Sequence, residues 1–407
     1  MMNHFYNILR YTFDQKLSPI GMMVFFFILF DGVLMYLAPI IITGAGISES
    51  MMGIIIGSSS IVGMVFDYLL YRMVKTIHYR RIFLVMFALA LLFPVFLLGG
   101  STIFIFLLAM AVWGIYYDFY NIGMLDIVER TSEPEEHASK FGILRSFEGL
   151  GYLLAPFFAS VLLVYLNPGP VMFFVILIPF LISFILYLNM AIYPIPERSK
   201  YVRFKESISL FFQRLIFKKE ISLPIFPLLI TFFINLVDTA IWTFGPLFSE
   251  QMGSDNNILG GSFMIAFALP PILIGWFIGS LVNRFGNTNA AQASIAFSSI
   301  FLILVGLTTS PSLLIILIFI ASFFLAIGIP SVNAIYTGYI NKVAEQRKQT
   351  ETIQDFFTNI GTTTGPVIGG YAAEYFGLSH AFIALGVIGL AVVFMLFIFT
   401  SRINHNQ

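Results

Sequence analysis

The sequence predicts an all-α integral membrane protein whose twelve transmembrane helices form two pseudo-symmetric six-helix bundles. Three observations carry this prediction. The chain of 407 residues is 58% hydrophobic and only 10% charged, which leaves too little charge to cover the surface of a soluble domain. Apolar runs recur along the chain at the length that spans a bilayer, about 20 residues. Features of the first half also reappear, in the same order, in the second half.

Twelve apolar segments are predicted to span the membrane, and most of the turns between them are short. In chain order the segments are 18–43, 50–72, 81–99, 102–125, 139–164, 170–192, 224–249, 260–281, 289–308, 312–336, 353–375 and 379–401. The one long connector, 193–223, is basic and partly amphipathic, which favours a solvated linker with an interfacial helix. It separates a first bundle, 1–192, from a second, 224–407.

Basic residues predict the orientation of these segments. All 21 lysines and arginines fall on one side of the membrane under this assignment, and the opposite loops carry only acids such as Glu49, Glu250 and Asp255. Because cytoplasmic loops collect lysine and arginine, both termini are predicted to be cytoplasmic. We therefore expect a multi-pass protein of the cytoplasmic membrane, with no cleaved signal peptide and in contact with the lipid bilayer.

The composition argues against several other classes of function. The formal net charge is zero, so no overall field favours a nucleic acid as partner. No cysteine is present, and the five histidines all fall in predicted loops or tails, which disfavours metal sites and imidazole relays. No phosphate-binding loop of the GxxxxGK[ST] type occurs. We expect no cofactor, no metal and no enzymatic activity.

Two acids lie inside apolar spans and repeat between the halves. Asp31 is followed by Pro39 and Asp238 by Pro246, with the same spacing, and the two acids are 207 residues apart. A carboxylate in hydrocarbon costs a few kcal/mol, so such an acid indicates a water-lined cavity or a bound proton. Both acids are predicted to face a shared central cavity.

The fifth and eleventh spans carry the second repeat, which is rich in small residues and proline. Its members are Gly151, Ala155 and Pro156 in the fifth span, and Gly361, Gly365, Pro366, Gly369 and Gly370 in the eleventh. Small residues four apart form one helical face that lets another helix approach closely, and proline adds a bend. Plain helix packing would explain these residues equally well. With the acids, they indicate a duplicated six-helix unit.

A third repeat follows the second and eighth spans. The first copy is Gly63-MVF-Asp67 with Arg72 beyond it, and the second is Gly279-SLV-Asn283-Arg284-Phe285-Gly286. Each copy can also be explained without a function in transport, as an acid at a helix end beside basic residues that set the orientation of the chain in the membrane. In these motifs the chain resembles the major facilitator superfamily, most of all its twelve-helix drug and metabolite proton antiporters, although Tyr68 and Leu70 depart from the loop signature.

The resemblance carries three implications for mechanism. It implies that the loop motif latches the cytoplasmic side in one state, and that spans 1, 4, 7 and 10 surround the cavity. It also implies exchange, because the small-residue face of the fifth span resembles the antiporter motif. The copy in the fifth span is degenerate, with Ala155 and Ala159 where the motif has glycine.

Polar and aromatic residues of the central spans are the candidate substrate ligands, with packing or an interfacial position as the alternative for any one aromatic. Besides Asp31 they are Trp113, Tyr117, Asn121, Asn235, Asp238, Trp242 and Asn333. For proton coupling we favour Asp31, then Asp238, then Asp118, with Glu148 as a further candidate. Asp118, Arg145 and Glu148 are predicted to lie at similar depth, and a structural ion cluster is at least as good an explanation of them.

The function that follows is that of a secondary active transporter for a small neutral or cationic solute. We expect alternating access with proton-coupled export, that is, an antiporter, acting as a monomer. Sodium as the coupling ion stays open. The alternative is a proton-coupled symporter that imports a sugar or a similar neutral solute, and a lipid flippase is a more distant possibility. An acidic cavity disfavours anions.

Overall fold

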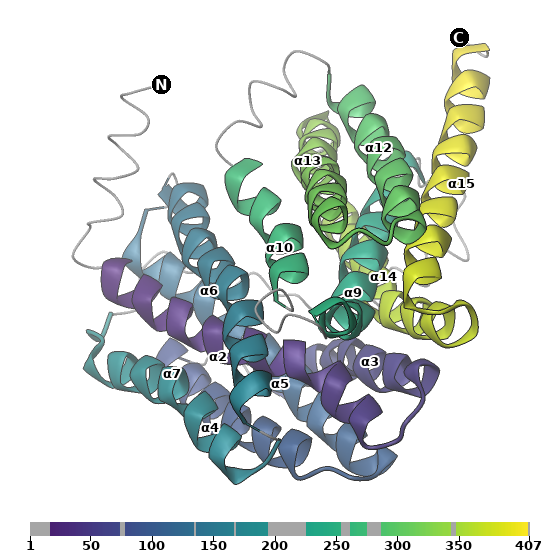
Figure 1. Ribbon diagram of the computed structural model, residues 1–407. Helices are drawn as coiled ribbons and strands as arrows, with labels where there is room; N and C mark the ends of the chain where they lie inside the picture. Colours follow the sequence, from purple (N-terminus) through teal and green to yellow (C-terminus); the bar gives the residue numbers. More distant parts are fainter. Residues whose placement is uncertain are drawn as a thin grey trace. The chain divides into compact units, whose positions relative to one another are not determined.

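The computed structural model describes residues 17–73, 78–133, 136–166, 168–193, 225–253, 261–274, 286–342 and 347–405. In these ranges the regular structure is helical throughout (Figure 1). The helices are α2 (Leu17–Gly44), α3 (Glu49–Met73), α4 (Tyr79–Leu98), α5 (Ile103–Thr131), α6 (His137–Tyr165), α7 (Pro170–Asn189), α9 (Ile225–Gly253), α10 (Ser262–Ile274), α12 (Asn287–Leu307), α13 (Pro311–Lys342), α14 (Arg347–Phe376) and α15 (Leu378–His405).

Each predicted span corresponds to one of these helices, so the all-α membrane fold is confirmed. Ten of the helices in the described ranges are long and apolar enough to cross a membrane. The other two are α10, of which 13 residues are described, and α14, which carries many polar residues. The chain is a multi-pass membrane protein.

The helices form two compact units. The first contains α2, α4, α5, α6, α7 and the part of α3 from Ile61 onward. The second contains the earlier part of α3, Ser48–Ser60, together with α9, α10 and α12 to α15. Helix α3 is thus shared between the units. Of the predicted linker 193–223, only Tyr193 is among the described residues, and the predicted bundle boundaries stay a prediction.

Packing in the first unit centres on α2, which lies against α6 and α7, while α4 packs on α5. The crossing of α2 and α6 depends on small residues. A Cβ atom at Gly32 would lie 2.7 Å from the Cβ of Ala155, and one at Gly151 would lie 2.9 Å from Ile28 Cγ2. Because neither glycine has a side chain, the two backbones approach closely around Asp31.

The second unit repeats this crossing with α9 and α14, while α12 packs on α13 and α15, and α10 on α13. A Cβ at Gly361 would lie 2.6 Å from the carbonyl oxygen of Phe232, and one at Gly365 would collide with Thr239. A Cβ at Gly369 would lie 3.0 Å from Phe244 Cδ1. Helix α9 therefore packs closely against the glycine face of α14. Gly370 faces another neighbour in this unit, with Gly53 Cα 3.0 Å from its ideal Cβ.

Candidate functional site

Asp31 lies in the middle of α2 and is completely buried. Three side chains donate hydrogen bonds to its carboxylate. Trp113 Nε1 and the Tyr116 hydroxyl reach Oδ1 at 2.9 and 2.5 Å, and the Tyr152 hydroxyl reaches Oδ2 at 3.1 Å. The donors come from α5 and α6, so Asp31 ties three helices together. Neutral donors around a buried carboxylate satisfy its oxygens without fixing its charge through a cation.

The second carboxylate of the first unit, Glu148, lies one turn before Tyr152 on α6. Arg145 Nη1 donates to both of its oxygens, at 2.6 and 2.7 Å. The Glu148 side chain is 7% exposed, whereas that of Arg145 is 61% exposed. The hydroxyls of Tyr117 and Tyr120 each lie 3.5 Å from a Glu148 oxygen. This ion pair therefore has one end inside the unit and the other at its surface.

Helix α5 carries the other candidate residues of the first unit. The Trp113 and Tyr117 rings are stacked, with centroids 5.3 Å apart. Asn121 is half-buried one turn further on. Asp118 lies against α3, because its Oδ2 atom is 2.8 Å from the position that a Cβ of Gly63 would take. Only a glycine leaves room there for the carboxylate.

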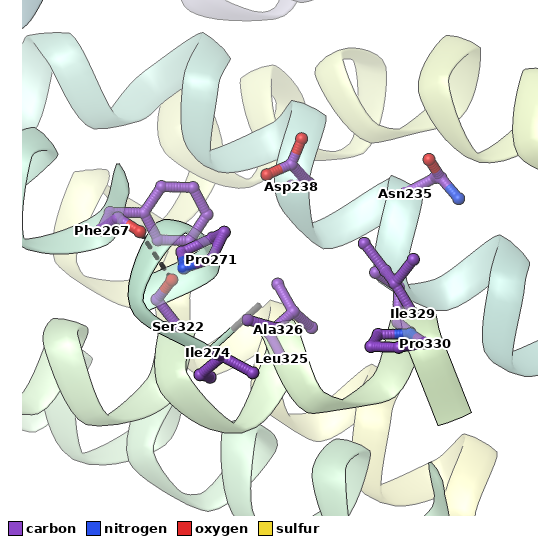
Figure 2. Close-up of a pocket in the computed structure, with 11 residues that line it drawn as sticks. Asn235, Asp238, Phe267, Pro271, Ile274, Ser322, Leu325, Ala326, Ile329 and Pro330 are labelled. Atoms are coloured by element: carbon purple, nitrogen blue, oxygen red, sulfur yellow. Dashed lines mark hydrogen bonds between the residues drawn. The ribbon is translucent and has the colours of Figure 1, made fainter. Parts of the chain in front are cut away.

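Asp238 of α9 lies on a cavity of about 230 Å³ within the second unit. The walls come from α9, α10 and α13, and the lining residues are Ile234, Asn235, Asp238, Phe267, Pro271, Ile274, Ser322, Leu325, Ala326, Ile329 and Pro330. Figure 2 shows Asp238 and Asn235 projecting from α9, with Ile329 and Pro330 on the opposite side. The Ser322 hydroxyl uses its one hydrogen within the protein, since it donates to the Phe267 carbonyl oxygen at 2.6 Å.

No described residue makes a hydrogen bond or an ion pair to the Asp238 carboxylate. The cavity lining holds no lysine, arginine or histidine. A second space of about 170 Å³ adjoins the first, since Ile234, Asn235 and Ile329 line both. Asn333 lines this second space, and its Oδ1 accepts from Gln354 Nε2 at 3.0 Å. The pair of spaces, the chamber, has a single carboxylate. The space beside Asp238 is mostly apolar, whereas the second space is lined mostly by polar residues, namely Thr231, Asn235, Asn333, Gln354 and Thr358.

The structure brings together some of the predicted site residues and separates others. Asn235, Asp238 and Asn333 share the chamber, whereas Trp242 is outside the described lining. Asp31 and Asp238 lie in different units, and the predicted shared cavity stays a prediction.

The predicted latch is described only in part. Gly279, Asn283 and Arg284 lie outside the described residues, and the side chains of Asp67 and Arg72 are outside them as well. Gly286 has φ of 79° and precedes the first residue of α12. Pro156 and Pro366 lie inside α6 and α14.

Two residues of the first unit were missed by sequence reasoning. Tyr116 and Tyr152 both bond to Asp31. Tyr152 follows Glu148 by four residues, and this spacing on one helical face was the available signal. The lining residues of α10 gave no signal, because Phe267, Pro271 and Ile274 belong to an unbroken apolar run.

The family of the chain follows from its sequence. The family model of the Major Facilitator Superfamily matches residues 20–288 and 228–407. The chain belongs to the Major Facilitator Superfamily. Members of this family are membrane transporters rather than enzymes, so this chain is a membrane transporter. The resemblance to the superfamily that the sequence motifs indicated is confirmed.

Individual superfamily relatives are distant. The multi-drug resistance efflux pump PmrA homolog of Lactococcus lactis subsp. lactis (strain IL1403) is 25% identical over 183 residues, which are 44% of this chain and 44% of that protein. The nucleoside transporter NupG has a TM-score of 0.72 at 13% identity, covering 94% of this chain and 98% of that one. A bacterial homolog of the human lysosomal transporter Spinster scores 0.73 at 15% identity, covering 94% and 96%. At these identities the two solved structures show the fold alone.

Proposed function

We propose that this superfamily transporter exports a small neutral or cationic solute across the cytoplasmic membrane in exchange for protons, by alternating access. The observation that carries the proposal is the contrast between the two repeated acids. Asp31 is surrounded by neutral hydrogen-bond donors, while Asp238 lines a cavity whose walls are mostly apolar. One acid therefore suits a proton and the other suits a solute.

In this proposal Asp31 carries the coupling proton. Its three donors can stabilise the carboxylate, and no described basic side chain bonds to it, so its charge changes when a proton arrives. A charged and a neutral carboxyl group favour different packings of the helices around them. Protonation of Asp31 would thereby shift the balance between the two access states, which is the requirement for coupling.

Asp238 would receive the solute. A pocket that is mostly apolar, with few polar groups, is typical of sites for small organic molecules. An uncompensated carboxylate in such a place attracts cations and repels anions. The size of the chamber favours a small solute or one segment of a larger one. The two units would rock about the central site.

Export is favoured over import by one relative. The PmrA homolog is named as a multi-drug resistance efflux pump, and it aligns with part of this chain.

The stacked rings of Trp113 and Tyr117 favour the second candidate, proton-coupled import of a sugar or a similar neutral solute. Flat aromatic faces with a nearby amide such as Asn121 suit sugar rings. Direction of flux separates the two candidates.

The test uses the purified protein in proteoliposomes with an imposed pH gradient. Ethidium serves as the cationic probe and labelled glucose as the neutral one. Antiport predicts that ethidium moves against the direction of the proton gradient, and symport predicts that glucose moves with it. A sodium gradient in place of the pH gradient identifies the coupling ion. If neither probe moves faster with a pH gradient than without one, proton coupling is refuted for both solute classes.

A further inference from the structure

A row of two hydroxyl groups lies between the two carboxylates of the first unit. From Asp31 Oδ2 the next oxygen is the Tyr152 hydroxyl at 3.1 Å, and the Tyr117 hydroxyl follows at 3.5 Å. The Tyr117 hydroxyl then lies 3.5 Å from Glu148 Oε1. Two tyrosines therefore bridge a buried acid to a second acid whose partner reaches the surface.

Because of the hydrogen-bonding capacity of Tyr152, the hydrogen bonds of this row can point in either of two directions. A phenol carries one hydrogen, so Tyr152 can donate either to Asp31 or to Tyr117, but not to both at once. If Asp31 is ionised, Tyr152 donates to it and can accept from Tyr117. If Asp31 is protonated, it can donate to Tyr152, which then donates to Tyr117, which donates to Glu148. Both arrangements satisfy every hydroxyl.

We propose that Tyr152 and Tyr117 form a proton relay between Asp31 and Glu148, an inference that rests on the proposed proton-coupled function. The Asp31 carboxyl O–H bond breaks as its proton passes to Tyr152. The Tyr152 phenol proton passes to Tyr117, and the Tyr117 proton forms the new O–H bond on Glu148. The net change converts protonated Asp31 and ionised Glu148 into ionised Asp31 and protonated Glu148. Both tyrosines end neutral, as they began.

Arg145 marks the outer end of the relay. Its guanidinium stays charged, so protonation of Glu148 removes the negative partner from this ion pair. Its side chain is 61% exposed, which gives the proton on Glu148 a way out of the unit. Arg145 precedes Tyr152 by seven residues, about 10 Å along α6. The basic-residue pattern predicts that this end of α6 is cytoplasmic, so the relay would release protons to the cytoplasm.

The spacing of the row also supplies a gate. Hydrogen bonds from a hydroxyl to an oxygen are about 2.5–3.0 Å long. The step from Tyr152 to Asp31, at 3.1 Å, is close to this range, while the two 3.5 Å steps, which both involve Tyr117, are clearly longer. Tyr117 belongs to α5, while Tyr152 and Glu148 belong to α6. The relay therefore conducts when α5 and α6 move closer together, and it is interrupted when they separate.

The other groups around the two acids are off this route. Trp113 and Tyr116 bond only to Oδ1 of Asp31, the oxygen that Tyr152 does not contact. Tyr120 lies 3.5 Å from Oε2 of Glu148 and makes no described bond to Tyr152 or Asp31. Tyr117 and Tyr120 thus have the same distance to the same carboxylate, but only Tyr117 continues to Asp31. They form a matched pair for an experiment.

The experiment follows the protonation of Asp31 by rapid-mixing infrared spectroscopy of the full-length protein in lipid nanodiscs. The carboxylic acid C=O band of Asp31 is assigned by its loss in Asp31→Asn, and its growth is timed after a drop in pH, without any added solute. We expect Tyr152→Phe and Tyr117→Phe to slow this growth about tenfold or more, a barrier increase of about 1.4 kcal/mol. Tyr120→Phe should match the unsubstituted protein.

The outcomes separate the relay from the proposed function. Equal rates in Tyr117→Phe and Tyr120→Phe would overturn the relay while leaving proton coupling intact. If no Asp31 band grows at any pH in the unsubstituted protein, Asp31 is not a proton carrier, and the proposed function fails at its first step. Should Tyr152→Phe not fold, Tyr117→Phe and Glu148→Gln decide the matter, since both remove a later member of the same row.

Discussion

The acids at position 31 and position 238 occupy equivalent places in the two halves, yet their surroundings are opposite. Asp31 is fully buried and accepts hydrogen bonds from three aromatic side chains. Asp238 lines a cavity of about 230 Å³ with no described hydrogen-bond partner. Duplication thus preserved the position of the acid and its spacing to the following proline, but not its chemical environment. Under the proposed function, the two halves take different parts of one transport cycle.

The helix crossings differ in a compensating way. In the first unit Gly32, which follows Asp31, packs against Ala155. In the second unit Thr239, which follows Asp238, packs against Gly365. At the residue that follows the acid, the glycine is on α2 in the first unit and on α14 in the second, and each crossing has further glycines, such as Gly151 and Gly361. Both solutions give a close approach, because only one of the two partners has to be without a side chain.

The largest expected effect is that of Asp31→Asn. The amide cannot carry the coupling proton, so transport driven by a pH gradient should fall about 100-fold or more. Solute exchange without a gradient should persist, because the cavity in the second unit is unchanged. Ethidium flux in proteoliposomes with and without a pH gradient measures both quantities. Gradient-driven flux at the unsubstituted level would remove Asp31 from the coupling mechanism.

Asp238→Asn should act on the solute instead. Losing a charged partner weakens binding by about 1.5–3 kcal/mol, so we expect ethidium affinity to fall by roughly tenfold to 100-fold. Labelled glucose, which has no charge, serves as the control probe and should be affected less. The Asp31 infrared band should titrate as before. If the band of Asp31 changes while ethidium affinity does not, the roles of the two acids have been assigned the wrong way round.

The crossing in the second unit can be broken and partly restored. Gly365→Ala places a methyl group against Thr239, and overpacking of this kind costs about 1–3 kcal/mol. Thermal unfolding in detergent should report this loss. The double variant Gly365→Ala with Thr239→Gly removes the clash with Thr239 but not the one with the Leu236 carbonyl oxygen, so it should recover only part of the loss. Absence of recovery would mean that the two residues do not act as a pair.

The smallest effect is expected from Ala326→Leu, which adds bulk to the cavity wall. Ethidium affinity should fall about fivefold to tenfold, with little change in stability, because the side chain enters open space. Ala321→Leu on the same helix is the matched control. Ala321 is only 1% exposed, so enlarging it should lower stability and leave ethidium binding alone. Equal loss of stability in both variants would contradict an open cavity at Ala326.

The sequence predicted the helices well and their ends less well. The predicted spans 312–336 and 353–375 correspond to α13, Pro311–Lys342, and α14, Arg347–Phe376. Hydropathy marks where a helix leaves hydrocarbon, whereas the backbone hydrogen bonds continue into polar residues beyond that point. Spacing also placed Asn235 and Asp238 on one face of α9, where both line the cavity. Periodicity within one helix is thus readable from sequence.

Which side chains meet across helices was a matter for the tertiary structure. By itself the sequence determined the membrane fold, twelve apolar spans that each correspond to a described helix, and the presence of two acids in such spans, because these depend on local composition and spacing. It did not determine that Tyr152 would reach Asp31, or that α10 would help enclose a space beside Asp238. The contact of Tyr152 with Asp31 depends on how closely two backbones approach, which is set by small residues such as Gly32 on α2 and Ala155 on α6, far apart in the chain.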